Sequence, residues 1–346
     1  MSLATQNTTR IHSGSPSEQI DAEYAWVTWI TAFQTGMASA KPVLRNAGIL
    51  GDQPTTTENY RIPLPPLGVG DDEEGTDGNE WGVVAPQTYQ VEGLVRKIGP
   101  KGLKFVENDL YENRVSAISM NMVAQGNTLG MWEDRQVAHT VLGESGFKTE
   151  ERTKAGIRKL TCSDGEPLFS RKHRYNPLYQ DKVPSGDSNL TSNIWDLPLT
   201  PDALLEIEAW FGSIKDEVGN PVFGNTELKL ALVVPTRLKS DANKAVKRRL
   251  VGEYQGGGGA AVDNVAFDIA EPIVLAQLRD PARWYVVVTN MAIKPVYRIG
   301  LKPMTPKEVG PGSDTWELKQ VMKRWYYERA DYRAFEWRLW ATSKRK

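Results

Sequence analysis

The sequence predicts an α+β protein with long extensions at one end. Apolar residues recur at helical spacing in several segments and alternate along strands in the last third of the chain. Between these regions lies a stretch rich in proline, glycine and acids, which a compact core would not tolerate. The 346 residues, 40% of them apolar, suffice for one large domain or two, and a charged fraction of 25% is ordinary for a soluble protein.

The N-terminal part predicts an arm followed by a helix. Residues 1–20 are polar and rich in Ser and Thr, which is typical of a flexible arm. Residues 22–38 place four large apolar side chains on one helical face: Trp26, Trp29, Ile30 and Phe33.

The next region predicts a long β-hairpin with an acidic tip, over residues 55–98. Its first part, IPLPPLGVGDDEEGTDGNEWG (62–82), has three prolines and six acids. Alternation then predicts a strand through Tyr89, Val91, Gly93 and Val95. The acidic run 71–80 does not fit a calcium-binding EF-hand loop, because its glycines stand at the wrong positions. It is interpreted as a solvated loop or as a docking surface for a basic patch on another subunit.

The longest expected helix covers residues 107–144, which Gly126 and Gly130 interrupt. Residues 150–198 have the composition of loops. A second helix is expected over 200–216, with Thr200 as N-cap and Pro201 in its first turn.

The remaining segments predict a buried strand at 227–235 and a helix that Thr236 caps and that runs to about Leu250. The exposed side of this helix is strongly basic. A flexible loop is expected at 255–264, followed by strands at 283–290 and 293–301. Two final strands in 323–343 carry aromatic residues on both faces, so this sheet is expected to be covered on both sides.

Residues 162–177, CSDGEPLFSRKHRYNP, contain the residues that most resemble an active site. A metal-dependent nuclease would use His173 as base or metal ligand, but only His12 and His139 remain as further histidines. No His-Glu-x-x-His or paired Cys-x-x-Cys spacing is present. The favoured interpretation is an ordered or interfacial loop, with Cys162 simply buried. A nuclease centred on His173 remains the minor alternative.

Other patterns also argue against an enzyme. The run QGGGGA lacks the Gly-Lys-Ser/Thr of a phosphate-binding loop. The basic helix at 237–250 is interpreted as a nucleic-acid contact or as a solvated face. A single cysteine excludes an intramolecular disulfide and a Cys-rich zinc site. With no metal-ligand or phosphate-binding motif in the sequence, neither a metal nor a cofactor is expected. There is no membrane-spanning run or signal peptide, and a soluble, cytoplasmically made protein is expected.

Several motifs occur together in a recognisable order over residues 85–343. The most specific is SDGEPLFSRKHRYNP followed by TSNIWDLPLTPDALLE. The others are TYQVEGLVRKIGPKGLKFVENDL, WEDRQVAHTVLGESGF, LALVVPTRLKSDANKAV, RWYVVVTNMAIKPVYRI and YRAFEWRLW. This order resembles the major head subunit family of Mu-like bacteriophages (the gpT-like family). Two features depart from that family: Arg-Tyr-Asn separates His173 from Pro177, and the glycine-rich segment 255–259 has no counterpart.

The resemblance implies the tailed-phage capsid fold of the Hong Kong 97 type. It would divide the chain into an N-terminal arm, an extended β-hairpin loop, a peripheral domain with a long spine helix, an axial domain and returning peripheral strands. The corresponding ranges are 1–54, 55–98, 99–199, 200–305 and 306–346.

The resemblance also implies a function: a major capsid protein that assembles into the icosahedral shell of a tailed phage around double-stranded DNA. The implied partners are further copies in hexamers and pentamers, scaffold, portal and decoration proteins, and DNA bound without sequence specificity. The implied location is the virion, assembled in the bacterial cytoplasm. A cellular nanocompartment of the same fold is the alternative. The residues expected at subunit interfaces are Asp71, Asp72, Glu73, Glu74, Arg171, Lys172 and Arg174.

Overall fold

The computed structural model describes residues 10–11, 20–64, 89–106, 115–174, 190–215, 221–223, 227–252, 261–309 and 321–344. The chain divides into two compact units. Unit 1 comprises Met1–Pro42, Arg96–Glu133 and Gly300–Ala330, and unit 2 comprises Val43–Val95, Asp134–Ile299 and Asp331–Lys346. None of the helices in the described ranges has the length and apolar character needed to span a bilayer. The five domain segments expected from the resemblance stay predictions.

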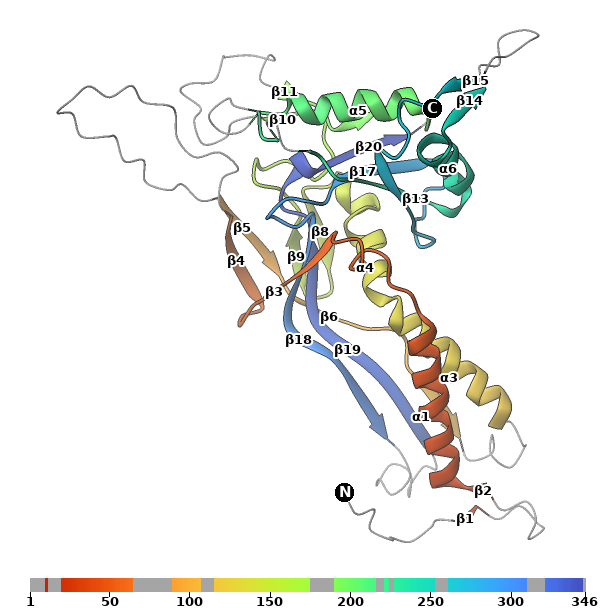
Figure 1. The fold of residues 1–346 in the computed structure, drawn as a ribbon. Coiled ribbons are helices and arrows are strands. Elements are labelled where there is room, and N and C mark those ends of the chain that lie inside the picture. The colour runs from red at the N-terminus through yellow and green to blue at the C-terminus, as the bar shows by residue number, and fades with distance from the viewer. Residues whose placement is uncertain are drawn as a thin grey trace, which may run out of the picture. The chain divides into compact units, whose positions relative to one another are not determined.

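Unit 1 is built on a helix pair, α1 (Ala22–Ser39) and α3 (Val115–Gly130), which lie side by side (Figure 1). The helix expected over 22–38 is thus confirmed. Its core also includes a tyrosine from a neighbouring strand, and the ring of Phe33 stacks on Tyr326 at 4.8 Å between centroids. The buried members of this core are Trp29, Phe33, Ile118, Met122 and Tyr326.

The two helices approach each other through glycines. A Cβ on Gly36 would lie 2.0 Å from the carbonyl oxygen of Val123, and one on Gly126 would lie 2.1 Å from that of Phe33. The expected single helix over 107–144 is therefore corrected in two ways. Gly126 lies within α3 because α1 leaves no room for a side chain there, and the helix ends at Gly130, with α4 (Trp132–Thr140) following. Residues 107–114 lie outside the described part.

Strands complete unit 1. The long strands β18 (Val296–Val309) and β19 (Val321–Arg333) pass through both units and pair with each other. Within unit 1, β19 pairs antiparallel with β6 (Arg96–Ile98) and β7 (Leu103–Val106). In the segment expected to be a flexible arm, only the pair of β1 (Arg10–Ile11) with β2 (Ile20–Asp21) is described.

The central sheet of unit 2 has five strands in the order β12-β20-β17-β13-β16. Every residue of β13 is buried, because the strand lies inside the sheet and the sequence LALVV offers only apolar side chains. β13 runs parallel to β16 and antiparallel to β17. The bounds are β12 (Ile194–Trp195), β13 (Leu230–Val234), β16 (Ala270–Val274), β17 (Arg283–Val288) and β20 (Trp340–Lys344).

Helices α5 (Pro201–Ser213) and α6 (Lys239–Lys247) flank this sheet (Figure 1). The predicted cap of α5 is confirmed, since the Thr200 side chain accepts a hydrogen bond from the Ala203 N–H. The predicted start and end of the next helix are wrong. Thr236 opens a 3-10 turn, η5 (Thr236–Leu238), and α6 ends at Lys247, so that Leu250 begins strand β14 (Leu250–Gly252).

Short hairpins and connections make up the rest of unit 2. The expectation that residues 150–198 form a loop is corrected. This segment contains the hairpin β8–β9 and the short strands β10, β11 and β12. The additional elements are β3 (Leu50–Pro54), β4 (Asn59–Leu64), β5 (Tyr89–Leu94), η2 (Glu144–Phe147), β8 (Glu150–Thr153), β9 (Gly156–Lys159), β10 (His173–Arg174), β11 (Leu190–Thr191), β15 (Ala261–Asp263) and η6 (Trp337–Leu339).

The C-terminal segment of unit 2 is buried almost along its whole described length. Every residue from 331 to 343 is buried, including Tyr332, Trp337 and Trp340. The prediction that the closing aromatic strands are covered on both sides is therefore confirmed for this segment.

Candidate functional site

The base of the predicted hairpin is an antiparallel pair, β4 with β5, in which Asn59 faces Leu94 and Leu64 faces Tyr89. Tyr60 faces Gly93 across the pair. The Tyr60 side chain packs directly over Gly93 and leaves no room for a side chain there. A Cβ on Gly93 would lie 2.1 Å from the Tyr60 hydroxyl oxygen. The predicted strand through Tyr89 to Val95 is confirmed over β5. Residues 65–88, including the acidic run, lie outside the described part.

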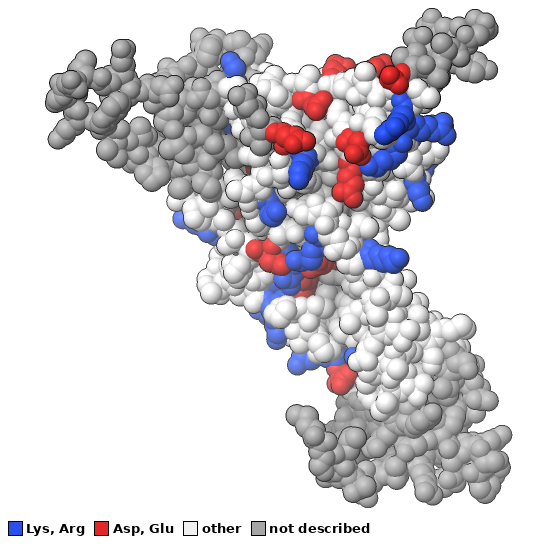
Figure 2. Space-filling view, in the orientation of Figure 1, with Lys and Arg blue, Asp and Glu red and all other residues white. Residues whose placement is uncertain are grey.

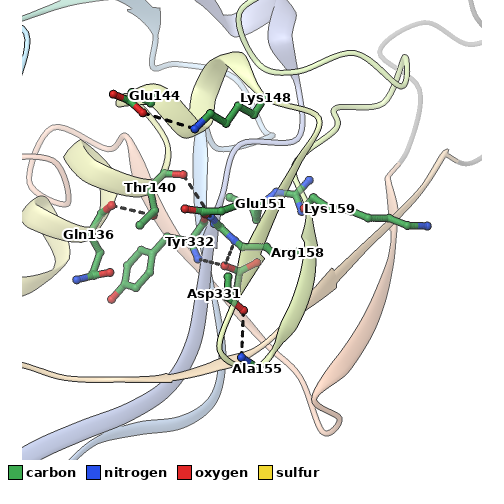
Figure 3. A network of polar contacts seen from close by, with 12 residues as sticks. Gln136, Thr140, Glu144, Lys148, Glu151, Ala155, Arg158, Lys159, Asp331 and Tyr332 are labelled. Carbon is green, nitrogen blue, oxygen red and sulfur yellow. Dashed lines mark hydrogen bonds and ion pairs between the residues drawn. The ribbon is translucent and has the colours of Figure 1, made fainter.

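A buried ionic network holds this base to the rest of unit 2. The hydroxyl of Tyr60 donates to Asp331 Oδ2 at 2.8 Å, and Arg158 Nε donates to Asp331 Oδ1 at 2.7 Å. Figure 3 shows Arg158 of β9 pointing at Asp331 and Tyr332 of β19. Both charged side chains of this pair are fully buried. Burial, and then the charge of Asp331, raises the pKa of Tyr60 far above its ordinary value, so the phenol stays a hydrogen-bond donor.

The arginine of this network satisfies several acceptors at once. Arg158 Nη2 donates to the Tyr332 carbonyl oxygen at 2.5 Å, and Nη1 lies 3.3 Å from Glu151 (Figure 3). The next residue, Arg333, is the last of β19 and donates to the carbonyl oxygens of Lys159 and Thr161. The two arginines thereby fasten β19 to the β8–β9 hairpin, and Arg333 also donates to the Glu92 carbonyl oxygen in β5, at the base of the predicted hairpin.

The loop around His173 is ordered by its own turns. Cys162 N donates to Glu166 O, and Glu166 N donates to Asp164 Oδ1. Gly165 has a φ of +84°, which favours glycine at this turn. The side-chain amide of Asn193 closes the loop by accepting from the Ser170 N–H and donating to the Leu168 carbonyl oxygen. An ordered loop is what the sequence predicted.

His173 is a packing residue in this loop. Its ring is fully buried and stacks on Trp337, with 4.2 Å between centroids and 5° between planes. Its Nδ1 lies 2.7 Å from Asp164 Oδ2. Within the described ranges, no group of three or more His, Cys, Asp or Glu residues could hold a metal ion. The described residues around His173 therefore offer no set of metal ligands that would support the nuclease hypothesis.

Cys162 is buried, as predicted. Burial, followed by the negative charges of Asp164 and Glu336, raises the pKa of its thiol well above the ordinary value. Because the thiolate is the reactive form, this environment opposes a role as nucleophile.

The cations of this loop differ in their surroundings. Arg171, Lys172 and Arg174 are all exposed, and Arg171 also pairs with Asp196 at 3.1 Å. The predicted acidic partners Asp71, Asp72, Glu73 and Glu74 lie outside the described residues. The interface assignment of all seven residues stays a prediction.

A polar cavity of about 430 Å³ opens elsewhere in unit 2. His139, Arg279 and Arg283 line it, and burial followed by the charges of Arg279 and Arg135 lowers the pKa of His139. Tyr285 at its wall donates to the Leu142 carbonyl oxygen at 2.5 Å. Because the cations Arg279 and Arg283 also line the cavity, their positive charge opposes the binding of a metal ion at His139.

No family model and no curated protein sequence matches the chain. Among solved structures, it is similar to the capsid of the cyanophage P-SCSP1u, with a TM-score of 0.53, 12% identity, and coverage of 89% of this chain and 89% of that chain. It is also similar to the capsid of a native GTA particle, with a TM-score of 0.51, 10% identity, and coverage of 98% and 94%. The predicted fold class, an α+β capsid fold of the Hong Kong 97 type, is thus confirmed.

Proposed function

We propose that this chain is the major capsid protein of a tailed bacteriophage, which self-assembles into an icosahedral shell around double-stranded DNA. The observation that carries the proposal is the agreement in fold, over 89% and 98% of the chain, with subunits of two capsids. A fold alone does not specify a function, but this agreement extends over almost the whole chain rather than one motif.

The local structure supports a shell subunit. The base of the predicted hairpin is fastened by buried arginines, and 24 residues, 65–88, connect its two strands. Extended segments bury much surface per residue when they bind a neighbour, which suits a subunit that contacts many others. Closed symmetric assembly also covers sheet edges that would otherwise promote aggregation.

The finer features are part of the same proposal. The motif order supports a relation to the Mu-like head subunits. The subunits would form hexamers and pentamers, assembled in the host cytoplasm with scaffold, portal and decoration proteins, and would contact DNA without sequence specificity. Asp71, Asp72, Glu73, Glu74, Arg171, Lys172 and Arg174 would lie at contacts between subunits. The exposed position of Lys172 and Arg174 supports the basic half of this assignment.

The test is assembly of the purified chain. We expect high-concentration samples to elute in the void volume of a size-exclusion column and to show closed shells or rings by negative-stain electron microscopy. A chain that stays monomeric, and that is absent from particles purified from a producing host, contradicts the proposal. Shells that enclose protein rather than DNA would instead support a cellular compartment.

A further inference from the structure

One face of α6 and its flanking residues concentrates positive charge. Figure 2 shows the blue side chains gathered over this helix. Lys244 pairs with Asp241 at 3.6 Å, and Lys247 pairs with Asp268 at 2.6 Å. The other cations have no ion pair with another residue of the described ranges. We call the whole set the α6 basic face: Arg237, Lys239, Lys244, Lys247, Arg248 and Arg249.

The C-terminal end of this face is held rigidly. Asn264 Nδ2 donates to the carbonyl oxygens of Ala245, at 2.8 Å, and Arg248, at 2.7 Å. The backbone N–H of Asp268 donates to the Val246 carbonyl oxygen. These bonds satisfy the carbonyl groups that a helix leaves free at its C-terminus, where cations are also favoured by the helix dipole. The face is therefore preorganised for a ligand of negative charge.

Apolar side chains border the basic ones. The turn that caps α6 exposes Val265 to 71% and Phe267 to 40%, and the guanidinium of Arg249 lies over the Phe267 ring. At the other end, Arg237 opens onto a groove of about 400 Å³ whose walls include Leu238 and Trp284. A surface that mixes cations with apolar side chains is typical of protein interfaces, where aromatic residues and arginine are enriched.

The chain itself contains a segment of the complementary composition. Residues 71–80 carry six acids and no base, and Trp81 follows directly. Since the whole chain has a net charge of −1, the remainder without these six acids is at +5. In an assembly of identical chains, every α6 basic face is matched by one such acidic segment.

We propose that the α6 basic face binds the acidic segment 71–80 of a neighbouring copy of this chain. This inference rests on the proposed function, because it names one contact within the shell. If extended as two strands, the 24 residues between β4 and β5 would reach at most about 40 Å from the hairpin base.

Two other binding arrangements fit less well. The loop of His173 offers fewer unpaired cations, since Arg171 is already paired with Asp196. Nucleic acid would use the cations but gains little from the exposed Val265 and Phe267, and duplex phosphates need no hydrophobic border. The acidic segment with its adjacent tryptophan uses both kinds of side chain.

The experiment uses charge reversal in full-length chains. The face variant carries Arg237→Glu, Lys239→Glu and Arg248→Glu. The segment variant carries four reversals: Asp71→Lys, Asp72→Lys, Glu73→Lys and Glu74→Lys. A matched control reverses three exposed lysines elsewhere, Lys101, Lys154 and Lys229, to glutamate. Circular dichroism melting of unassembled protein checks that each variant is folded as the wild type is.

We expect each variant alone to lower the yield of shells by about tenfold or more, because like charges then face each other at every repeat of the contact. Mixing the two variants should restore assembly, since each chain then offers a complementary charge to the other. The control should assemble as the wild type does.

Other outcomes overturn the inference while leaving the proposed function intact. Face-variant shells at wild-type yield show that the contact does not exist, and reduced DNA content in such shells would assign the face to nucleic acid. Rescue only when both sets of reversals are on one chain shows a contact within the subunit. Failure of every combination shows that charge complementarity is not the cause. If the wild type itself forms no shells, the proposed function fails, and this inference with it.

Discussion

Replacing Arg158 by methionine should destabilise unit 2 severely. The substitution keeps an unbranched apolar side chain but removes the guanidinium from Asp331, whose carboxylate is fully buried and 2.7 Å from Arg158 Nε. Asp331 keeps the Tyr60 hydroxyl and the Tyr332 N–H as donors, yet its charge loses its buried counter-ion. Removing one member of a buried pair costs about 3–5 kcal/mol, because the remaining charge is left in a medium of low dielectric constant.

The free energy of unfolding can be followed by urea denaturation of the unassembled subunit. Three buried tryptophans of unit 2, Trp284, Trp337 and Trp340, report its unfolding by fluorescence. With a slope of about 2–3 kcal/mol per molar urea for a unit of this size, the midpoint should fall by about 1–2 M.

The adjacent residue supplies the control. Lys159 lies in the same strand, but its side chain is 61% exposed and pairs with Glu92 at the surface. Lys159→Met should change the unfolding free energy by at most about 1 kcal/mol, since exposed ion pairs contribute little. Equal midpoints for the Arg158 and Lys159 variants would refute the argument that burial of the Arg158–Asp331 pair makes the difference.

Three further changes follow from the packing and the electrostatics. Gly93→Ala should detach the hairpin base, because its Cβ would lie 2.1 Å from the hydroxyl oxygen of a buried, hydrogen-bonded Tyr60; limited proteolysis should then cleave this region faster than in the wild type. Gly126→Ala should lower the free energy of unfolding of unit 1 by about 1–3 kcal/mol, since the α1 backbone must shift to make room for the methyl group. An unchanged thermal melting curve would contradict this. Asp52→Asn should cost at most about 1 kcal/mol near neutral pH. The hydrogen bonds from Arg45 lower the pKa of Asp52, so its contribution is present above the ordinary value of 3.8 and is lost as the pH falls through the lower, folded-state pKa; urea midpoints of the two proteins should converge in acid.

The sequence by itself determined the elements whose signals are local. Helix α5 is recognisable because Thr200 and Pro201 mark its start and its apolar residues recur along one face. The buried strand β13 is recognisable from five consecutive apolar residues. The order of motifs along the chain was enough to predict the capsid fold class that the solved structures confirm.

Some local signals misled because tertiary contacts decided the outcome. Gly126 resembles a helix breaker, yet it lies inside α3, since its missing side chain is what lets α1 approach. The β8–β9 hairpin lacks the Asn-Gly turn that is typical of a two-residue hairpin loop. It is held instead by contacts from Arg333, which lies far away in the sequence.

The tertiary structure alone brought together the residues on which the candidate site depends. Arg158 and Asp331 stand 173 positions apart, and neither lies in a motif that would mark it. His173 and Trp337 each lie in a recognisable motif, but only the folded chain stacks their rings, and this contact makes His173 a packing residue rather than a catalytic one. Periodicity and capping act between residues a few positions apart and can be read along the chain. A buried charge depends on which partner the completed fold places beside it, and only the three-dimensional structure contains that information.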